Sequence, residues 1–74
     1  MRIYYINKKE QSEGFHDIHT SDCTYLPDAE YKQYLGVFTH CKHALQGAKT
    51  LFTKVNGCPY CIKECYREGG YGKP

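Results

Sequence analysis

Two short stretches decide how this chain folds, His19-Thr20-Ser21-Asp22-Cys23 and Cys58-Pro59-Tyr60-Cys61. The first places a His and a Cys four positions apart, and the second places two Cys three positions apart. Tetrahedral zinc takes four ligands from Cys thiolates and His nitrogens, often as two closely spaced pairs. Pro59 stiffens the second turn by fixing φ, and Gly57 permits the chain reversal before it. The sequence therefore predicts one Zn²⁺ held by His19, Cys23, Cys58 and Cys61.

Neighbouring residues leave alternatives open. His16 lies three residues before His19 and could replace it, although the H-x-x-x-C spacing favours His19. Cys65 follows Cys61 by one helical turn and could be an accessory metal ligand or a redox-sensitive neighbour. A small buried residue is the favoured interpretation of Cys65, because free Cys is among the most buried residue types. The C-x-x-C pair could also be a redox site or two inert thiols, but a thioredoxin-like pair follows a βαβ pattern, whereas a helix is expected before this one.

The composition indicates that a metal stabilises the fold. The chain has 74 residues and 8.6 kDa, with only thirteen Leu, Ile, Val and Phe residues, and small domains with thin cores need disulfides, a metal or a partner. Five Cys is an odd number, which argues against a full disulfide framework. No signal peptide or membrane-spanning apolar stretch is recognisable. We therefore expect a cytoplasmic protein whose thiols stay reduced.

Hydrophobic patterning predicts an α+β fold with a short antiparallel sheet. Residues 2–6 and 34–38 are predicted as strands, because Ile, Tyr, Val and Phe dominate them. Residues 15–19 could form another short strand, with Phe15 and His19 on one face. A single domain is expected over residues 1–68, and the Gly-rich stretch 69–74 is expected to be a flexible tail.

One main helix is expected after the third strand. Thr39 is a typical helix N-cap, and Asn56-Gly57 would end the helix. His40 and His43 would then be solvated, whereas Cys41 would lie in the core. A short C-terminal helix is predicted over residues 62–67. The main helix would bury the stripe Cys41, Ala44, Leu45, Ala48, Leu51, Phe52 and Val55.

The order of these features resembles the Ada-like metal-binding domains, which are the zinc modules of the Ada DNA-repair protein and of some nucleases. The matching features are Phe15-His16, His19 and Cys23, the strand ending at Val37-Phe38, a Thr-capped helix with small residues, and Gly57-Cys58-Pro59-Tyr60-Cys61. The resemblance covers residues 16–61 and implies the zinc fold, although the helix and loop are longer here. In Ada, the first ligand of the first pair is a Cys that accepts a methyl group from a DNA phosphotriester. His19 occupies that position, which argues against the transfer activity.

These features favour a non-enzymatic structural zinc module that binds nucleic acid or a protein. Four good ligands predict a closed zinc shell, whereas catalytic zinc keeps an open position. The formal charge of +2 is too small to imply nucleic acid by itself, and we expect a monomer. Five basic residues could form a strip that contacts phosphates, and the alternative is an ordinary solvated surface. This basic strip comprises Lys42, Lys49, Lys54, Lys63 and Arg67. The competing functions are a zinc-thiolate methyl acceptor and a thiol-based redox or metal sensor.

Overall fold

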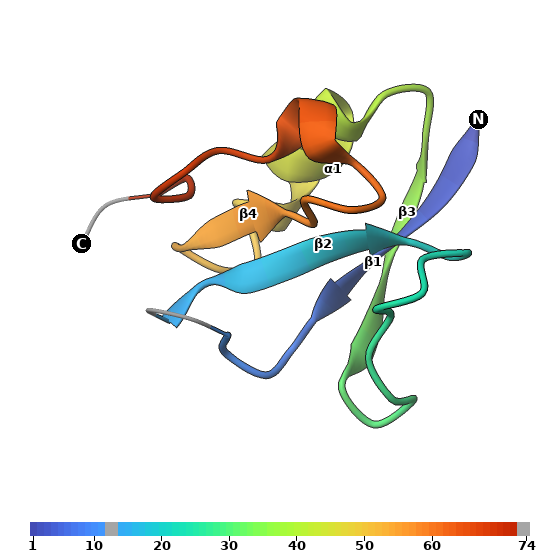
Figure 1. Cartoon of the computed structure of the whole chain (residues 1–74), viewed down its shortest axis with the longest axis horizontal. Helices are drawn as coiled ribbons and strands as arrows, with labels where there is room; N and C mark the ends of the chain where they lie inside the picture. Colours follow the sequence, from blue (N-terminus) through green and yellow to red (C-terminus); the bar gives the residue numbers. More distant parts are fainter. Residues whose placement is uncertain (12–13, 73–74) are drawn as a thin grey trace.

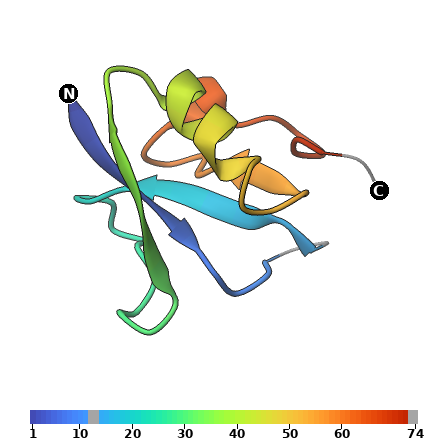
Figure 2. The same ribbon diagram turned by 180° about the vertical axis from the view of Figure 1, so that it is seen from behind.

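A computed structural model describes residues 1–11 and 14–72 of the chain. Its elements are β1 (Arg2–Asn7), β2 (His16–Thr20), β3 (Lys32–Phe38), α1 (Cys41–Ala48), β4 (Val55–Gly57) and the 3₁₀ turn η2 (Lys63–Cys65). The strands form one sheet in the order β3-β1-β2-β4, and α1 and η2 lie together on one side of it (Figures 1 and 2). The predicted α+β class, with one main helix, is confirmed. No helix among the described residues is long and apolar enough to cross a membrane.

The sheet is mixed rather than wholly antiparallel. β1 pairs antiparallel with both β2 and β3, as the three predicted strands suggested. β4 instead pairs parallel with β2, in the register His16 to Val55 and Ile18 to Gly57. Because parallel neighbours run in the same direction, β2 and β4 end at the same edge of the sheet.

The core lies between the sheet and α1, which contacts all four strands. Tyr4 and Ile6 of β1 alternate with the more exposed Ile3 and Tyr5, as expected for a strand with one buried face. The buried side chains that complete this layer are Ile18, Cys41, Ala44, Leu45, Ala48, Val55, Cys58, Ile62 and Cys65.

The main helix is shorter than predicted and is capped differently. Its N-cap is His40 rather than Thr39, and His40 Nδ1 accepts a 3.0 Å hydrogen bond from the Lys42 backbone N–H. Its last residue is Ala48, after which the Thr50 hydroxyl donates to the Gly47 carbonyl at 2.6 Å. The first half of the apolar stripe is helical and buried, whereas Leu51 is 48% exposed.

The expectation that Asn56-Gly57 ends the main helix is wrong, because these residues belong to β4. The Asn56 side chain bonds instead to the backbone of Arg67, with its amide donating to the Arg67 carbonyl at 2.9 Å and its carbonyl accepting from the Arg67 N–H at 3.0 Å. Asn56 thereby ties β4 to the segment after η2. Gly57 is required for a different reason, since a Cβ there would lie 3.0 Å from the backbone carbonyl of Cys65.

The C-terminal end of the described chain packs against β4. Val55 and Tyr71 exchange two backbone hydrogen bonds of 3.0 and 2.8 Å, and a Cβ on Gly70 would overlap the Phe15 ring. The stretch expected to be a flexible tail begins at Gly69. Gly70 and Tyr71, which make these contacts, belong to it. Residues 73–74 lie outside the described residues. The predicted C-terminal helix is a single 3₁₀ turn.

Candidate metal centre

The parallel pairing of β2 and β4 brings the two sequence motifs together. His19 is on β2, and Cys23 lies in the turn that follows it. Cys58 follows β4 directly, and its backbone N–H donates to the Ile18 carbonyl at 2.9 Å. Cys61 lies one turn further on, with the Ile62 N–H donating to the Cys58 carbonyl at 3.1 Å. The motifs are distant in sequence, but they meet because both strands end at one sheet edge.

These four residues form a group that could hold a metal ion. One potential ligand atom from each of His19, Cys23, Cys58 and Cys61 lies within 4.8 Å of all the others. The Sγ atoms of Cys23 and Cys58 are 3.8 Å apart. A tetrahedral site with Zn–S bonds of about 2.3 Å requires sulfur atoms about 3.8 Å apart. The spacing of these two sulfurs therefore suits a tetrahedral ion of that size.

His19 has the properties of an unused ligand. Its side chain is buried, and Nδ1 is the one buried side-chain nitrogen or oxygen without a hydrogen-bond partner in the described part of the chain. Leaving such an atom unpaired costs about 1–3 kcal/mol. Burial also lowers the pKa of His19, which favours the neutral imidazole that a metal needs. A metal ion bound to His19 Nδ1 would give this atom the partner that it lacks.

Backbone N–H groups point at two of the sulfur atoms. Thr20 donates to Cys61 Sγ, and Tyr25 donates to Cys23 Sγ, both at 3.4 Å. Such contacts favour thiolates around a metal. Burial, aided by the adjacent Cys58 and Cys61, raises the pKa of the Cys23 thiol to about 12. A cation bound between these sulfurs would favour the thiolate form of Cys23.

His16 lies outside this group. Its Nδ1 is 2.9 Å from the Asn7 carbonyl oxygen, and its ring stacks on Phe52 with ring centroids 3.8 Å apart. The first contact joins the imidazole to β1, and the second packs it against the segment after α1.

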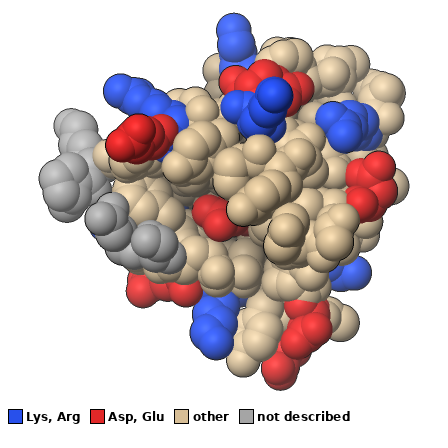
Figure 3. Space-filling view, viewed as in Figure 1, with Lys and Arg blue, Asp and Glu red and all other residues tan. Residues whose placement is uncertain are grey.

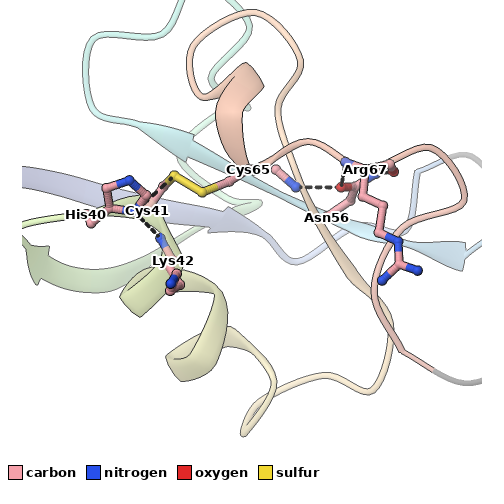
Figure 4. The surroundings of a disulfide bond; sticks show 7 residues. His40, Cys41, Lys42, Asn56, Cys65 and Arg67 are labelled. Atoms are coloured by element: carbon pink, nitrogen blue, oxygen red, sulfur yellow. Dashed lines mark hydrogen bonds between the residues drawn. A yellow bond between two sulfur atoms is a disulfide. The ribbon is translucent and has the colours of Figure 1, made fainter.

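Cys65 also lies outside it, and the structure joins Cys65 to Cys41 in a disulfide (Figure 4). The expectation that all the thiols are reduced is therefore wrong for this pair. Both residues are buried, as predicted for each. His40 is exposed, as expected, but its Nδ1 lies 3.8 Å from Cys41 Sγ, a neighbour that the sequence did not predict.

Three of the basic residues proposed as a strip lie over aromatic rings. Lys49 and Arg67 both lie over the Tyr71 ring, at 5.1 and 5.7 Å from its centroid, and Lys54 lies 4.7 Å from the centroid of Phe15. On the face in Figure 3, Lys and Arg side chains are interspersed with Asp and Glu. Binding of nucleic acid through this strip stays a prediction.

Sequence reasoning missed an exposed aromatic pair beside the ligand group. The rings of Tyr25 and Tyr60 lie with centroids 4.4 Å apart, although the side chains are 57% and 71% exposed. They line a groove of about 310 Å³ together with Arg2, Thr20, Asp22, Cys23, Thr24 and Cys61. Their positions in the sequence could have indicated that they lie near each other, because Tyr25 is two residues from Cys23 and Tyr60 directly precedes Cys61.

Comparison of the chain with models of known families, with curated proteins and with solved structures found no match. The resemblance to Ada-like domains therefore stays a prediction that rests on the order of motifs.

Proposed function

We propose that this chain is a structural zinc module in which His19, Cys23, Cys58 and Cys61 hold one Zn²⁺. The observation that carries the proposal is the unpaired Nδ1 of buried His19, in a residue grouped with three free cysteines. Sulfur and imidazole suit zinc, whereas Mg²⁺ and Ca²⁺ prefer oxygen ligands. Four protein ligands would fill a tetrahedral shell and leave no position for a catalytic water. That closed shell argues against catalysis by a zinc-bound water, and we propose a non-enzymatic role.

Removing the imidazole ligand tests this proposal. We expect His19→Ala to weaken zinc affinity by at least about 100-fold, since even the hydrogen-bond partners of metal ligands are worth about 10–100-fold. His19→Cys should restore tight binding, because four-Cys zinc sites are common. The measurement is chelator competition on the full chain, with His43→Ala on the exposed side of α1 as the matched control. Unchanged affinity in His19→Ala would refute the assignment of this ligand.

We also propose single-stranded nucleic acid as the partner class, on the strength of the exposed Tyr25–Tyr60 pair. Bases stack on exposed aromatic rings at about 1–3 kcal/mol per base. Arg2 lines the same groove and could meet a phosphate. Because the chain carries a formal charge of only +2, binding should be weak and sensitive to salt.

The tyrosines can be tested against the basic strip. We expect Tyr25→Ala with Tyr60→Ala to reduce binding of a fluorescent single strand at least about tenfold at low salt. Tyr34→Ala is the control, because Tyr34 is about as exposed as Tyr25, at 58%, but lies on β3. A loss seen only in Lys42→Ala with Lys49→Ala would assign binding to the strip instead. No binding of the unaltered protein at about 50 mM salt would end the nucleic-acid proposal.

A further inference from the structure

A second group of metal-ligating side chains lies at the start of α1. The Sγ atoms of Cys41 and Cys65 are joined in the disulfide, and His40 Nδ1 lies 3.8 Å from Cys41 Sγ (Figure 4). One potential ligand atom from each of the three residues lies within 4.8 Å of the other two. None of these residues belongs to the candidate centre at His19.

We propose that this group is a redox-gated second metal site, closed by the disulfide when oxidised and able to bind Zn²⁺ through His40, Cys41 and Cys65 when reduced. One imidazole and two thiolates match the ligand set of zinc sites that retain an open fourth position. That position would take water or the carboxylate of Glu64, which lines a groove with His40 and Cys65. The ligand set rests on different residues from the proposed function and does not depend on it.

The local electrostatics suit a dithiolate that carries a metal. Cys41 is the first residue of α1, where the helix N-terminus favours a thiolate. Lys42 and Lys49 line the groove beside the pair and would oppose a bare cation. Two thiolates with one Zn²⁺ are formally neutral, so these lysines do not oppose the loaded site.

The surroundings of the disulfide also permit its reduction and the binding of a metal ion in its place. Cys65 and His40 line a groove of about 280 Å³, which gives a reductant or an ion a route to the Cys65 side of the disulfide. His40 caps α1 through Nδ1. It can ligate through Nε2 and keep that hydrogen bond, or through Nδ1 in place of it. The required movement is small, because the sulfurs need only separate to about 3.8 Å around one Zn²⁺.

The chemical step is a two-electron reduction followed by proton release. A dithiol reductant breaks the Sγ–Sγ bond, leaves Cys41 and Cys65 as thiols, and is itself oxidised to a disulfide. Each thiol gives its proton to solvent as it ligates the metal. The first residue of α1 is therefore held to η2 in either state, by a disulfide or by two metal–sulfur bonds.

The test counts metal ions on the full chain by native mass spectrometry in excess Zn²⁺. The oxidised protein is compared with protein reduced by a phosphine, which becomes a phosphine oxide and contributes no thiol of its own. We expect reduction to add one Zn²⁺ per chain, whatever the occupancy of the His19 centre. After loading, alkylation of Cys41 and Cys65 should slow at least about tenfold relative to reduced protein in chelator, because a metal-bound thiolate is shielded.

His40→Asn separates ligation from capping. Asn is a preferred N-cap, and this variant keeps the disulfide, so it should fold and yet bind the second ion at least about tenfold more weakly. His43→Asn on the same helix is the control and should bind it normally. The proposal is overturned if reduction adds no ion, if His40→Asn binds the second ion like the unaltered protein, or if the Cys41→Ser, Cys65→Ser double variant still gains one.

Discussion

Cys58→Ser is expected to leave the chain without a cooperative unfolding transition, even in zinc-containing buffer. Cys58 is 2% exposed, its sulfur lies 3.8 Å from that of Cys23, and its N–H joins the turn to β2. Structural zinc supplies apparent folding free energies of about 10–16 kcal/mol in small finger peptides. The net stability of a small domain is about 5–15 kcal/mol. Losing most of the folding free energy supplied by zinc would therefore remove most or all of the stability of this domain. Thermal and urea unfolding followed by circular dichroism measure the effect.

The control for Cys58→Ser is the Cys41→Ser, Cys65→Ser double variant. It also replaces Cys by Ser, but it keeps all four residues of the candidate centre. This double variant should retain a cooperative transition. If Cys58→Ser still unfolded cooperatively with EDTA present, metal binding at this centre would not be what stabilises the fold.

The second large effect is expected from the disulfide itself. Cys41 and Cys65 are 24 positions apart in sequence, and closing a loop of that size removes about 3 kcal/mol of chain entropy from the unfolded state. The double variant should therefore lose about 3 kcal/mol of stability, which in a domain of this size lowers Tm on the order of 15 °C. Urea unfolding with the His19 centre loaded, and without free zinc, measures it.

Reduction gives an independent check on the disulfide. A phosphine should lower the stability of the unaltered protein by the same amount under those conditions, whereas the double variant should not respond. Equal stability of the two proteins before reduction would mean that the disulfide contributes nothing to the folded state.

The candidate centre was predictable because its ligands come in local pairs. The separations of His19 from Cys23 and of Cys58 from Cys61 are fixed by single turns, so the sequence alone reveals each pair. That the two pairs meet depends on β4 pairing parallel with β2, which the sequence analysis did not predict. The four residues come together through a different local structure from the one expected, with a strand rather than a helix leading into Cys58.

The end of the helix was mispredicted because periodicity is a local signal. Val55 continues the apolar stripe of α1 in sequence, but it is buried by pairing with His16 and Tyr71. Phe52 likewise belongs to the stripe, yet it packs on the His16 ring. Contacts between distant segments thus override helical spacing after Ala48.

The disulfide had no local signal. Cys41 fits the buried stripe of a helix, and Cys65 sits one helical turn after a predicted metal ligand, so each had a sufficient explanation without the other. Their pairing follows only from the placement of η2 beside the start of α1. His40 was missed for the same reason, since its role as N-cap and its place beside Cys41 depend on where α1 begins.

Metal content decides whether zinc stabilises this fold. It is measured by native mass spectrometry of the purified protein before and after EDTA, with a circular dichroism spectrum of each sample. We predict one Zn²⁺ per chain in the oxidised protein and loss of the folded spectrum when the ion is removed. A metal-free protein whose spectrum is the same with and without EDTA would contradict it, and Cys23, Cys58 and Cys61 would then be three buried or half-buried thiols with no structural role for a metal.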